Sequence, residues 1–240
     1  MQNRYVGDIG DFVKLALLRE LAPDRRLGIA WWLYPDESHN KDGRHIDYLK
    51  SPEQWRHLDT KVFDALNVVI ASNIRDVVLL ENGGFLPDAK FYRKQIPVDG
   101  SPTERVLARE KWFSELQLEM ADRDLIFLDP DNGLEPSRFS FGIKKAGKSA
   151  AISELLALKA PGRALVIYHH QTRRKGGHVE EIAYRASQLL DAGFSSVDAI
   201  RSQPYSPRMF FLLNASPELR RKAEAFALRW KGSLSWHPAG

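Results

Sequence analysis

The chain has 240 residues, 43% of them hydrophobic and 28% charged, which is the balance of a globular protein and excludes a disordered or fibrous one. It contains no cysteine, so disulfides and thiolate metal sites are excluded, and we expect a reducing, cytoplasmic location. No apolar run approaches the roughly 18–20 residues of a membrane span, and the first residues lack the apolar core of a signal peptide. We therefore expect no membrane contact, and the net charge of +4 favours polyanionic partners such as RNA or DNA.

The first half of the chain mixes helical and extended patterns. Phe12, Leu15 and Leu18 recur at helical spacing, which predicts a helix over 11–21 with Asp11 as its cap. Further along, the pattern predicts strands at 27–33, 76–81 and 91–98 and a helix at 103–120.

The second half of the chain alternates strands with helices. The expected elements are a strand at 125–129, a helix at about 149–159, a strand at 164–169, a helix at about 178–190, strands at 196–200 and 208–214, and a polar helix at 217–230. Such alternation is typical of a Rossmann-like α/β fold, with a mostly parallel sheet between two layers of helices. Because no helix separates the last two strands, one of them is expected to run antiparallel. With no repeat, low-complexity tract or linker, we expect a single domain over 1–240.

The stretch LIFLDPDNGLE, residues 125–135, ends an apolar strand on acidic residues and turn formers. The next parallel strand also ends on polar residues, and ligands of open parallel sheets bind beyond the carboxyl ends of the strands. We therefore expect five side chains to converge on one crevice, namely Asp129, Asp131, Asn132, His169 and His170. Since neighbouring strand residues point to opposite faces, only one histidine is expected to face that crevice. The alternative is that Asp-Pro and Asp-Asn-Gly only form a turn.

Two short motifs resemble a known family. The segment GDIGDFVK, residues 7–14, and the segment LDPDN, residues 128–132, are similar to the Gly-Asn-x-x-Asp-x-x-Lys and Asp-Pro-Pro-Tyr motifs of bacterial 23S ribosomal RNA adenine-N6 methyltransferases. These enzymes belong to the class I S-adenosylmethionine-dependent methyltransferases, whose order of helices and strands the chain also resembles. The sequence is similar, too, to a set of bacterial proteins that share the Gly-Asp-x-x-Asp start and the Leu-Asp-Pro-Asp-Asn-Gly loop.

The resemblance implies methyl transfer to an amine of a base in RNA or DNA. Asp129 and Pro130 would hold the acceptor amine, Asn132 would donate to it or accept from it, and His169 or His170 would assist removal of its proton. Asp131 and Asn132 stand where the family has a second proline and an aromatic residue, so this loop lacks the ring on which a flipped base stacks. The aromatic residues that remain as substitutes are Tyr5, Phe139, Phe141 and Tyr168.

S-adenosylmethionine is the implied cofactor, with Gly7, Asp11 and Lys14 at the lip of its pocket and Glu81 as a candidate ligand of the ribose. The family's first strand runs into a glycine-rich turn, whereas here Trp31-Trp32 follows. We expect these side chains to obstruct the usual approach of the cofactor. Packing in the core is the expected role of the two tryptophans themselves.

A basic loop follows the strand that ends at His170. Arg173, Arg174 and Lys175 precede two glycines and suit a phosphate backbone, which makes the loop a candidate nucleic-acid contact. A solvated surface loop is the alternative.

Two other functions fit the same residues. In a metal-dependent nuclease or phosphoesterase, Asp129, Asp131 and Glu135 would hold Mg²⁺ or Mn²⁺. The lysines that would neutralise phosphate charge in that enzyme are Lys144, Lys145 and Lys148. A scaffold without catalytic activity that binds RNA, DNA or a protein partner is the third possibility.

Overall fold

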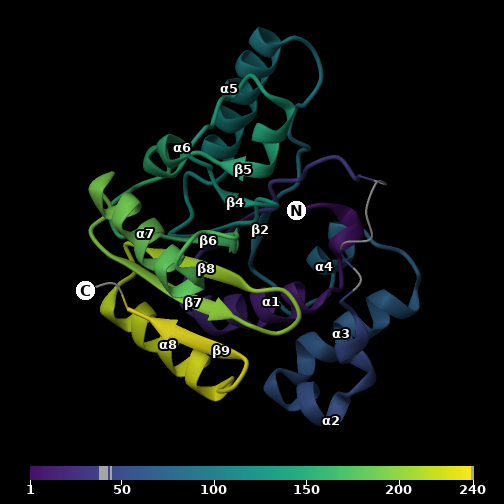
Figure 1. Ribbon diagram of the computed structural model, residues 1–240. Helices are drawn as coiled ribbons and strands as arrows, with labels where there is room; N and C mark the ends of the chain where they lie inside the picture. The colour runs from purple at the N-terminus through teal and green to yellow at the C-terminus, as the bar shows by residue number, and fades with distance from the viewer. Residues whose placement is uncertain (38–42, 44, 239–240) are drawn as a thin grey trace.

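A mixed sheet forms the centre of the protein in the computed structural model, which describes residues 1–37, 43 and 45–238 (Figure 1). Its strands are β1 (Leu27–Ala30), β2 (Lys90–Tyr92), β3 (Leu125–Leu128), β6 (Ala164–His170), β7 (Val197–Ser202), β8 (Arg208–Leu213) and β9 (Leu234–His237). They lie in the order β2-β1-β3-β6-β8-β7-β9. A separate small sheet pairs β4 (Gly133–Leu134) with β5 (Ser149–Ala150).

The sheet is parallel from β2 to β6 and antiparallel beyond it. Strand β8 lies between β6 and β7 and is antiparallel to both, and β9 joins the far edge antiparallel to β7. The Rossmann-like α/β class and the antiparallel strand near the end of the chain are therefore confirmed. Strand β9 was not predicted, because its four residues follow a helix and are too few to establish an alternating pattern.

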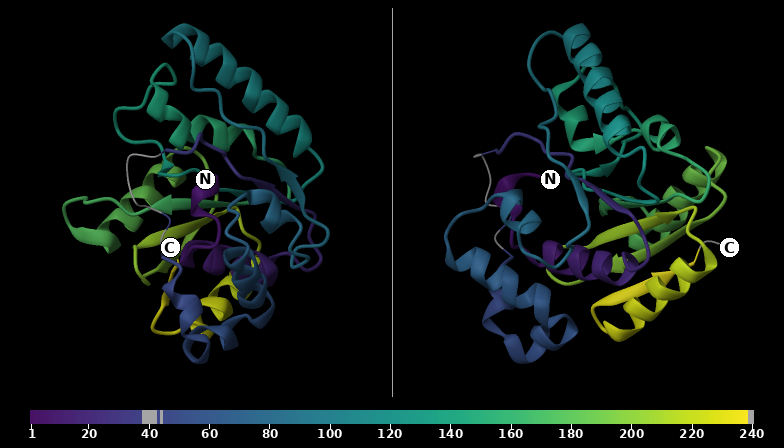
Figure 2. Two further views of the ribbon diagram at one scale, coloured as in Figure 1. Left: turned by 90° about the vertical axis from the view of Figure 1, so that its right-hand side faces the viewer. Right: turned by 180° about the vertical axis from the view of Figure 1, so that it is seen from behind.

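Helices cover both faces of the sheet. They are α1 (Ile9–Leu21), α2 (Pro52–Trp55), α3 (Thr60–Ala71), α4 (Val77–Glu81), α5 (Pro102–Glu119), α6 (Ile152–Ala157), α7 (Gly177–Asp191) and α8 (Pro217–Arg229). Figure 2 shows α1 and α8 on the opposite side of the sheet from α5. Strand side chains alternate between the two sides, since Phe127 packs in the core with α1, α3 and α8 while Ile126 packs in the core with α5, α6 and α7.

The strand predicted at 76–81 is wrong, because this segment forms helix α4. Asp76 accepts a hydrogen bond from the backbone N–H of Val78 at 2.9 Å and thereby caps the helix. Val77 and Leu80 are buried, a spacing that also fits a helix, so the short apolar run was ambiguous.

The predicted cap of the first helix is also wrong. Asp8, and not Asp11, is the N-cap of α1, since its carboxylate accepts from the N–H groups of Gly10 and Asp11 at 2.6 and 3.2 Å. The Asp11 carboxylate accepts instead from the N–H of Gly7 at 2.7 Å.

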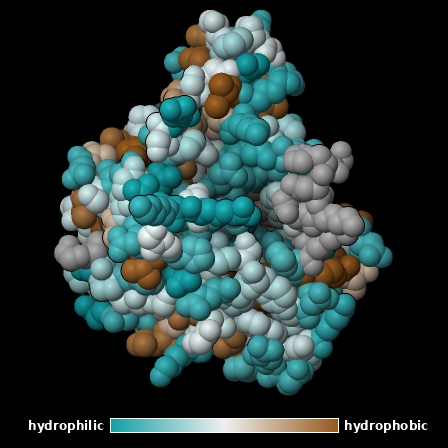
Figure 3. Space-filling model, viewed as in Figure 1, coloured by the Kyte–Doolittle hydropathy of each residue, from teal (hydrophilic) through white to brown (hydrophobic). Residues whose placement is uncertain are grey.

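Trp31 and Trp32 follow directly after β1 and are fully buried in different cores, which confirms their role in the core. Trp31 stacks on Phe91, and Trp32 meets Trp112 edge to face at 4.9 Å between ring centroids. The space-filling view of Figure 3 shows a largely hydrophilic face with scattered hydrophobic residues. Within the described ranges, no helix combines the length and the apolar character that crossing a bilayer requires.

Candidate active site

The strand order places a crevice at the carboxyl edge of the sheet. From β1 the chain passes to β2 on one side and later to β3 on the other, and such a reversal opens a ligand crevice beyond the ends of the two central strands. A cavity of about 460 Å³ lies at this edge, in the size range of small-molecule sites. The candidate residues from the sequence that line it are Tyr5, Asp11, Lys14, Asp129, Asp131, Asn132, Lys148, Tyr168 and His170.

Lys14 joins two carboxylates in this cavity. Its Nζ lies 2.5 Å from Asp129 Oδ2 and 2.8 Å from Asp11 Oδ1, and all three side chains are buried. Burial by itself lowers the pKa of Lys14, but the charges of Asp11 and Asp129 outweigh it and raise that pKa above its ordinary value. Burial raises the pKa of Asp11 to about 6, against the opposing charge of Lys14. Lys14 is therefore a permanent cation between β3 and α1.

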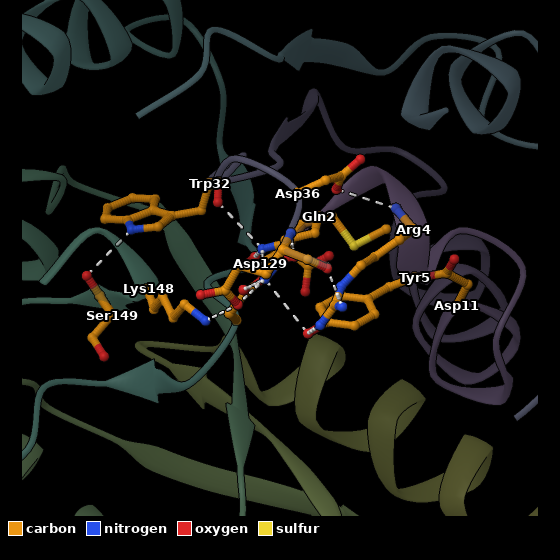
Figure 4. Close-up of polar contacts among 12 residues, drawn as sticks. Gln2, Arg4, Tyr5, Asp11, Trp32, Asp36, Asp129, Lys148 and Ser149 are labelled. Carbon is orange, nitrogen blue, oxygen red and sulfur yellow. Dashed lines mark hydrogen bonds and ion pairs between the residues drawn. The ribbon is translucent and has the colours of Figure 1, made fainter. Parts of the chain in front are cut away.

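The Met1 amino group bridges the ends of β1 and β3. It donates to the carbonyl oxygens of Asp129 at 2.6 Å and Trp32 at 3.2 Å, and it lies 2.7 Å from the Asp131 carboxylate. Gln2 Nε2 donates to Asp131 Oδ2 at 2.5 Å, and Figure 4 shows this cluster around Asp129. These contacts fix Asp131 beside the cavity. No sequence pattern marks an amino group for such a role.

The two histidines at the end of β6 separate as expected. His170 lines the cavity, whereas His169 is 1% exposed and points away from it. His169 Nδ1 accepts from the N–H of Leu134 at 2.9 Å, and Nε2 lies 3.3 Å from Glu181 Oε1. Burial lowers the pKa of His169, so the ring is neutral with its proton on Nε2, donated to Glu181. The catalytic prediction for His169 is corrected, because both of its nitrogens are occupied in the core.

The Asp-Asn-Gly sequence was also expected to form a turn, and its glycine does occupy one. Gly133 has a φ of +87°, and a Cβ there would collide with His169. The Pro130 carbonyl accepts from the N–H of Gly133 at 3.2 Å and thus belongs to the turn, not to the cavity wall. Asp129 and Asp131 face the cavity from the same loop, so it serves both as a turn and as part of the site.

Two predicted cofactor residues lie outside the cavity wall. Glu81 accepts from Trp31 Nε1 at 2.9 Å and pairs with Arg93, so its role as a ribose ligand at this cavity is corrected. The cause is the helical state of α4, which carries the carboxylate away from the edge expected for a strand. Gly7, with a φ of +89°, acts through its N–H, which holds the carboxylate of Asp11.

The three predicted metal ligands are not gathered. Glu135 lines a different hollow, and its N–H donates to the Ala150 carbonyl oxygen at 3.0 Å. Asp129 and Asp131 instead contact the ammonium groups of Lys14 and Met1. In the part of the chain that the structure describes, no group of three or more His, Asp or Glu side chains is arranged to hold a metal ion.

The basic loop after β6 lies beside α7. Arg173 and Arg174 line a small hollow together with Arg185, and the Arg174 guanidinium lies over the Tyr184 ring at 3.5 Å. Lys175 is exposed. The loop therefore presents cations at the carboxyl edge, next to the strand that carries His170.

The fold and the cavity define a class of protein: a Rossmann-like α/β protein with a buried lysine–carboxylate cluster at its topological switch point. No protein-family model and no curated protein matches the chain.

Proposed function

We propose that this protein is an S-adenosylmethionine-dependent enzyme that methylates an amine of a base in RNA or DNA. The observation that carries the proposal is the position of Asp129. Its carboxylate follows directly after β3, at the switch point, and lines a cavity large enough for a small molecule. The two resembling motifs meet at this point, because Lys14 of the first contacts Asp129 of the second.

Asp129 acts on the acceptor amine. S-adenosylmethionine, when bound, supplies an electrophilic methyl group. The Asp129 carboxylate accepts a hydrogen bond from the amine and orients the nitrogen lone pair. Its negative charge stabilises the positive charge that develops on the nitrogen as the new bond forms. His170, on the next strand, takes up the proton that the amine releases.

Lys14 and Asp11 position Asp129. One buried ammonium shared by two carboxylates leaves the group with net negative charge, which suits the cationic sulfonium and the positive charge that develops on the acceptor nitrogen. The hydrogen bond from Gly7 to Asp11 anchors this group to the start of α1. Lys14 therefore fixes Asp129 without neutralising the whole site.

The residues of the cavity fit this cofactor, although the glycine-rich turn of the family is absent. The side chains of Trp31 and Trp32 pack in the two cores, so they do not fill the cavity. Met1 covers the ends of β1 and β3 instead. The carboxylates of the cavity wall suit the sulfonium and ammonium groups of the cofactor. The guanidinium of Arg208 in the same wall suits the carboxylate of the cofactor. The groups that would hold the cofactor thus lie on α1 and β8.

The acceptor is proposed to be a nucleic-acid base on two grounds. Tyr5 and Tyr168 line the cavity and offer rings for stacking, which the loop after β3 lacks. The candidates Phe139 and Phe141 pack edge to face on each other at 5.0 Å, outside the cavity. The second ground is the basic loop after β6, whose arginines and lysine suit phosphates next to the site.

Ligand binding and methyl transfer test this proposal. S-adenosylhomocysteine is expected to raise the melting temperature, and a labelled methyl group is expected to appear in RNA or DNA treated with the protein. Asp129→Asn keeps the size of the side chain and is expected to reduce transfer about 10²- to 10⁴-fold. Asp99→Asn, at an exposed position, is the matched control. Stabilisation by Mg²⁺ or Mn²⁺ with cleavage of the nucleic acid, or full transfer by Asp129→Asn, would contradict the proposal.

A further inference from the structure

Arg208 lines the cavity and takes no part in the methyl transfer itself, but its guanidinium suits the carboxylate of the cofactor. It is 4% exposed, its Nε donates to the Ser206 carbonyl oxygen at 3.1 Å, and its Nη1 lies 3.7 Å from Asp8 Oδ1, beyond hydrogen-bonding distance. Among residues 1–37, 43 and 45–238, neither Nη1 nor Nη2 has a hydrogen-bond acceptor. Since Arg208 lines the cavity, these guanidinium donors are open to it and suit an anionic ligand.

The fold directs this guanidinium into the cavity. Arg208 begins β8 and pairs with His170 of β6, which also lines the cavity. Gly10, in the first turn of α1, leaves the space that the guanidinium occupies, since a Cβ at this position would collide with Arg208 Nη1. The helix and the strand, which are far apart in the sequence, therefore form one wall.

Asp8 provides the opposite charge in the same wall. Its Oδ1 accepts from the first N–H groups of α1, whereas its Oδ2 accepts no hydrogen bond from the described residues. Asp8 and Arg208 thus form a long ion pair, at 3.7 Å, in which both side chains keep hydrogen-bonding capacity, and both residues line the cavity. A ligand group that carries a carboxylate and an ammonium on one carbon atom satisfies both. A phosphate satisfies only Arg208 and is repelled by Asp8.

We propose that Arg208 and Asp8 bind the zwitterionic end of the ligand, an α-amino acid group whose carboxylate contacts Arg208 and whose ammonium contacts Asp8. The assignment rests on the proposed function, since S-adenosylmethionine carries such a group. The assignment names the residues that recognise the amino acid end. It also gives the orientation of the ligand, with that end against α1 and β8.

Calorimetric titration with two nucleosides tests this assignment. S-adenosylhomocysteine has the amino acid end, and 5′-methylthioadenosine lacks it. Arg208→Gln is expected to weaken binding of the first about 10- to 100-fold and to leave binding of the second nearly unchanged. Asp8→Asn, which keeps an oxygen to cap α1, is expected to act in the same direction. Arg221→Gln, at an exposed position of α8, is the control and is expected to bind as wild type.

Separate titrations with L-methionine and with inorganic phosphate distinguish failure of this assignment from failure of the proposed function. If S-adenosylhomocysteine does not bind but L-methionine does, and does so only with Arg208 present, the amino acid site stands and the cofactor is wrong. Binding of S-adenosylhomocysteine that Arg208→Gln leaves unchanged overturns the assignment and keeps the proposed function. Binding of phosphate in preference to L-methionine, or binding of none of these ligands, also overturns it.

Discussion

Lys14 Nζ lies 2.5 Å from Asp129 Oδ2, and this contact joins the first helix of the chain to the end of a central strand. Both side chains are buried, and Asp11 shares the same ammonium at 2.8 Å. Removing one member of such a cluster leaves buried charge without a partner, which is far less favourable than replacing the whole cluster.

Lys14→Met is therefore expected to reduce the free energy of unfolding by about 3–5 kcal/mol, since Asp129 and Asp11 both lose their partner. Chemical denaturation followed by circular dichroism measures the change. Lys111→Met, at an exposed position of α5, is the control and is expected to stay within about 0.5 kcal/mol of wild type. Equal effects of the two substitutions would show that the contact with Asp129 contributes nothing to stability.

The pKa of Asp11 predicts a pH dependence of stability. Burial raises this pKa from 3.8 to about 6 in the folded protein, so the folded state binds the proton more tightly than the unfolded chain does. The resulting stabilisation is complete below pH 3.8 and is lost as the pH rises through about 6. Between pH 4 and pH 6.5, wild type is expected to lose about 1–3 kcal/mol relative to Asp11→Asn. Unfolding curves of both proteins across this range measure the difference. If the free energies of unfolding of the two proteins change in parallel with pH, the pKa of Asp11 is not raised by folding.

The sequence predicted the centre of the sheet and half of the site. The strands that end at Leu128 and His170 are buried apolar runs followed by turn formers, which is a local signal. Their parallel pairing brought Asp129, Asp131 and His170 to one edge, as expected from alternation alone.

The rest of the site depends on pairings that local patterns do not encode. Arg208 reaches the cavity only because β8 inserts between β6 and β7. Met1 reaches it because the start of the chain folds over the ends of β1 and β3, and Asp8 reaches it as the N-cap of α1. The error at Glu81 had a local cause, since a short apolar run fits a helix as well as a strand.

Gly133→Ala is expected to destabilise the protein through a collision and not only through its backbone angle. Gly133 and Gly162 both have a positive φ, +87° and +71°, but only at Gly133 does a Cβ meet a neighbour, His169. Gly162→Ala is therefore the matched control, with an expected loss of about 1–2 kcal/mol for the left-handed conformation. Gly133→Ala is expected to lose at least about 2 kcal/mol more, because β4 must move away from β6. Thermal and chemical unfolding of the two variants tests the difference, and equal losses would contradict the packing argument.

Substitution of His169 is expected to lower stability, because this residue is part of the core. Substitution of His170 is expected to lower activity, because this residue lines the cavity. His169→Ala leaves the Leu134 N–H and the Glu181 carboxylate without their partner, so the free energy of unfolding is expected to fall by about 2–4 kcal/mol. His170→Gln is expected to keep the stability of wild type and to lower methyl transfer about 10²-fold.

The exposed His57, replaced by alanine, is the control for both measurements. Burial lowers the pKa of His169, so its contribution to stability rests on the neutral ring. That contribution is complete above the ordinary pKa of 6.5, begins to fall below it, where the unfolded chain takes up the proton first, and is lost once the pH falls through the lowered pKa of the folded protein. The stability difference between wild type and His169→Ala is therefore expected to narrow below pH 6.5. A difference that widens in acid would mean that His169 is charged in the folded protein and that the proton assignment on Nε2 is wrong.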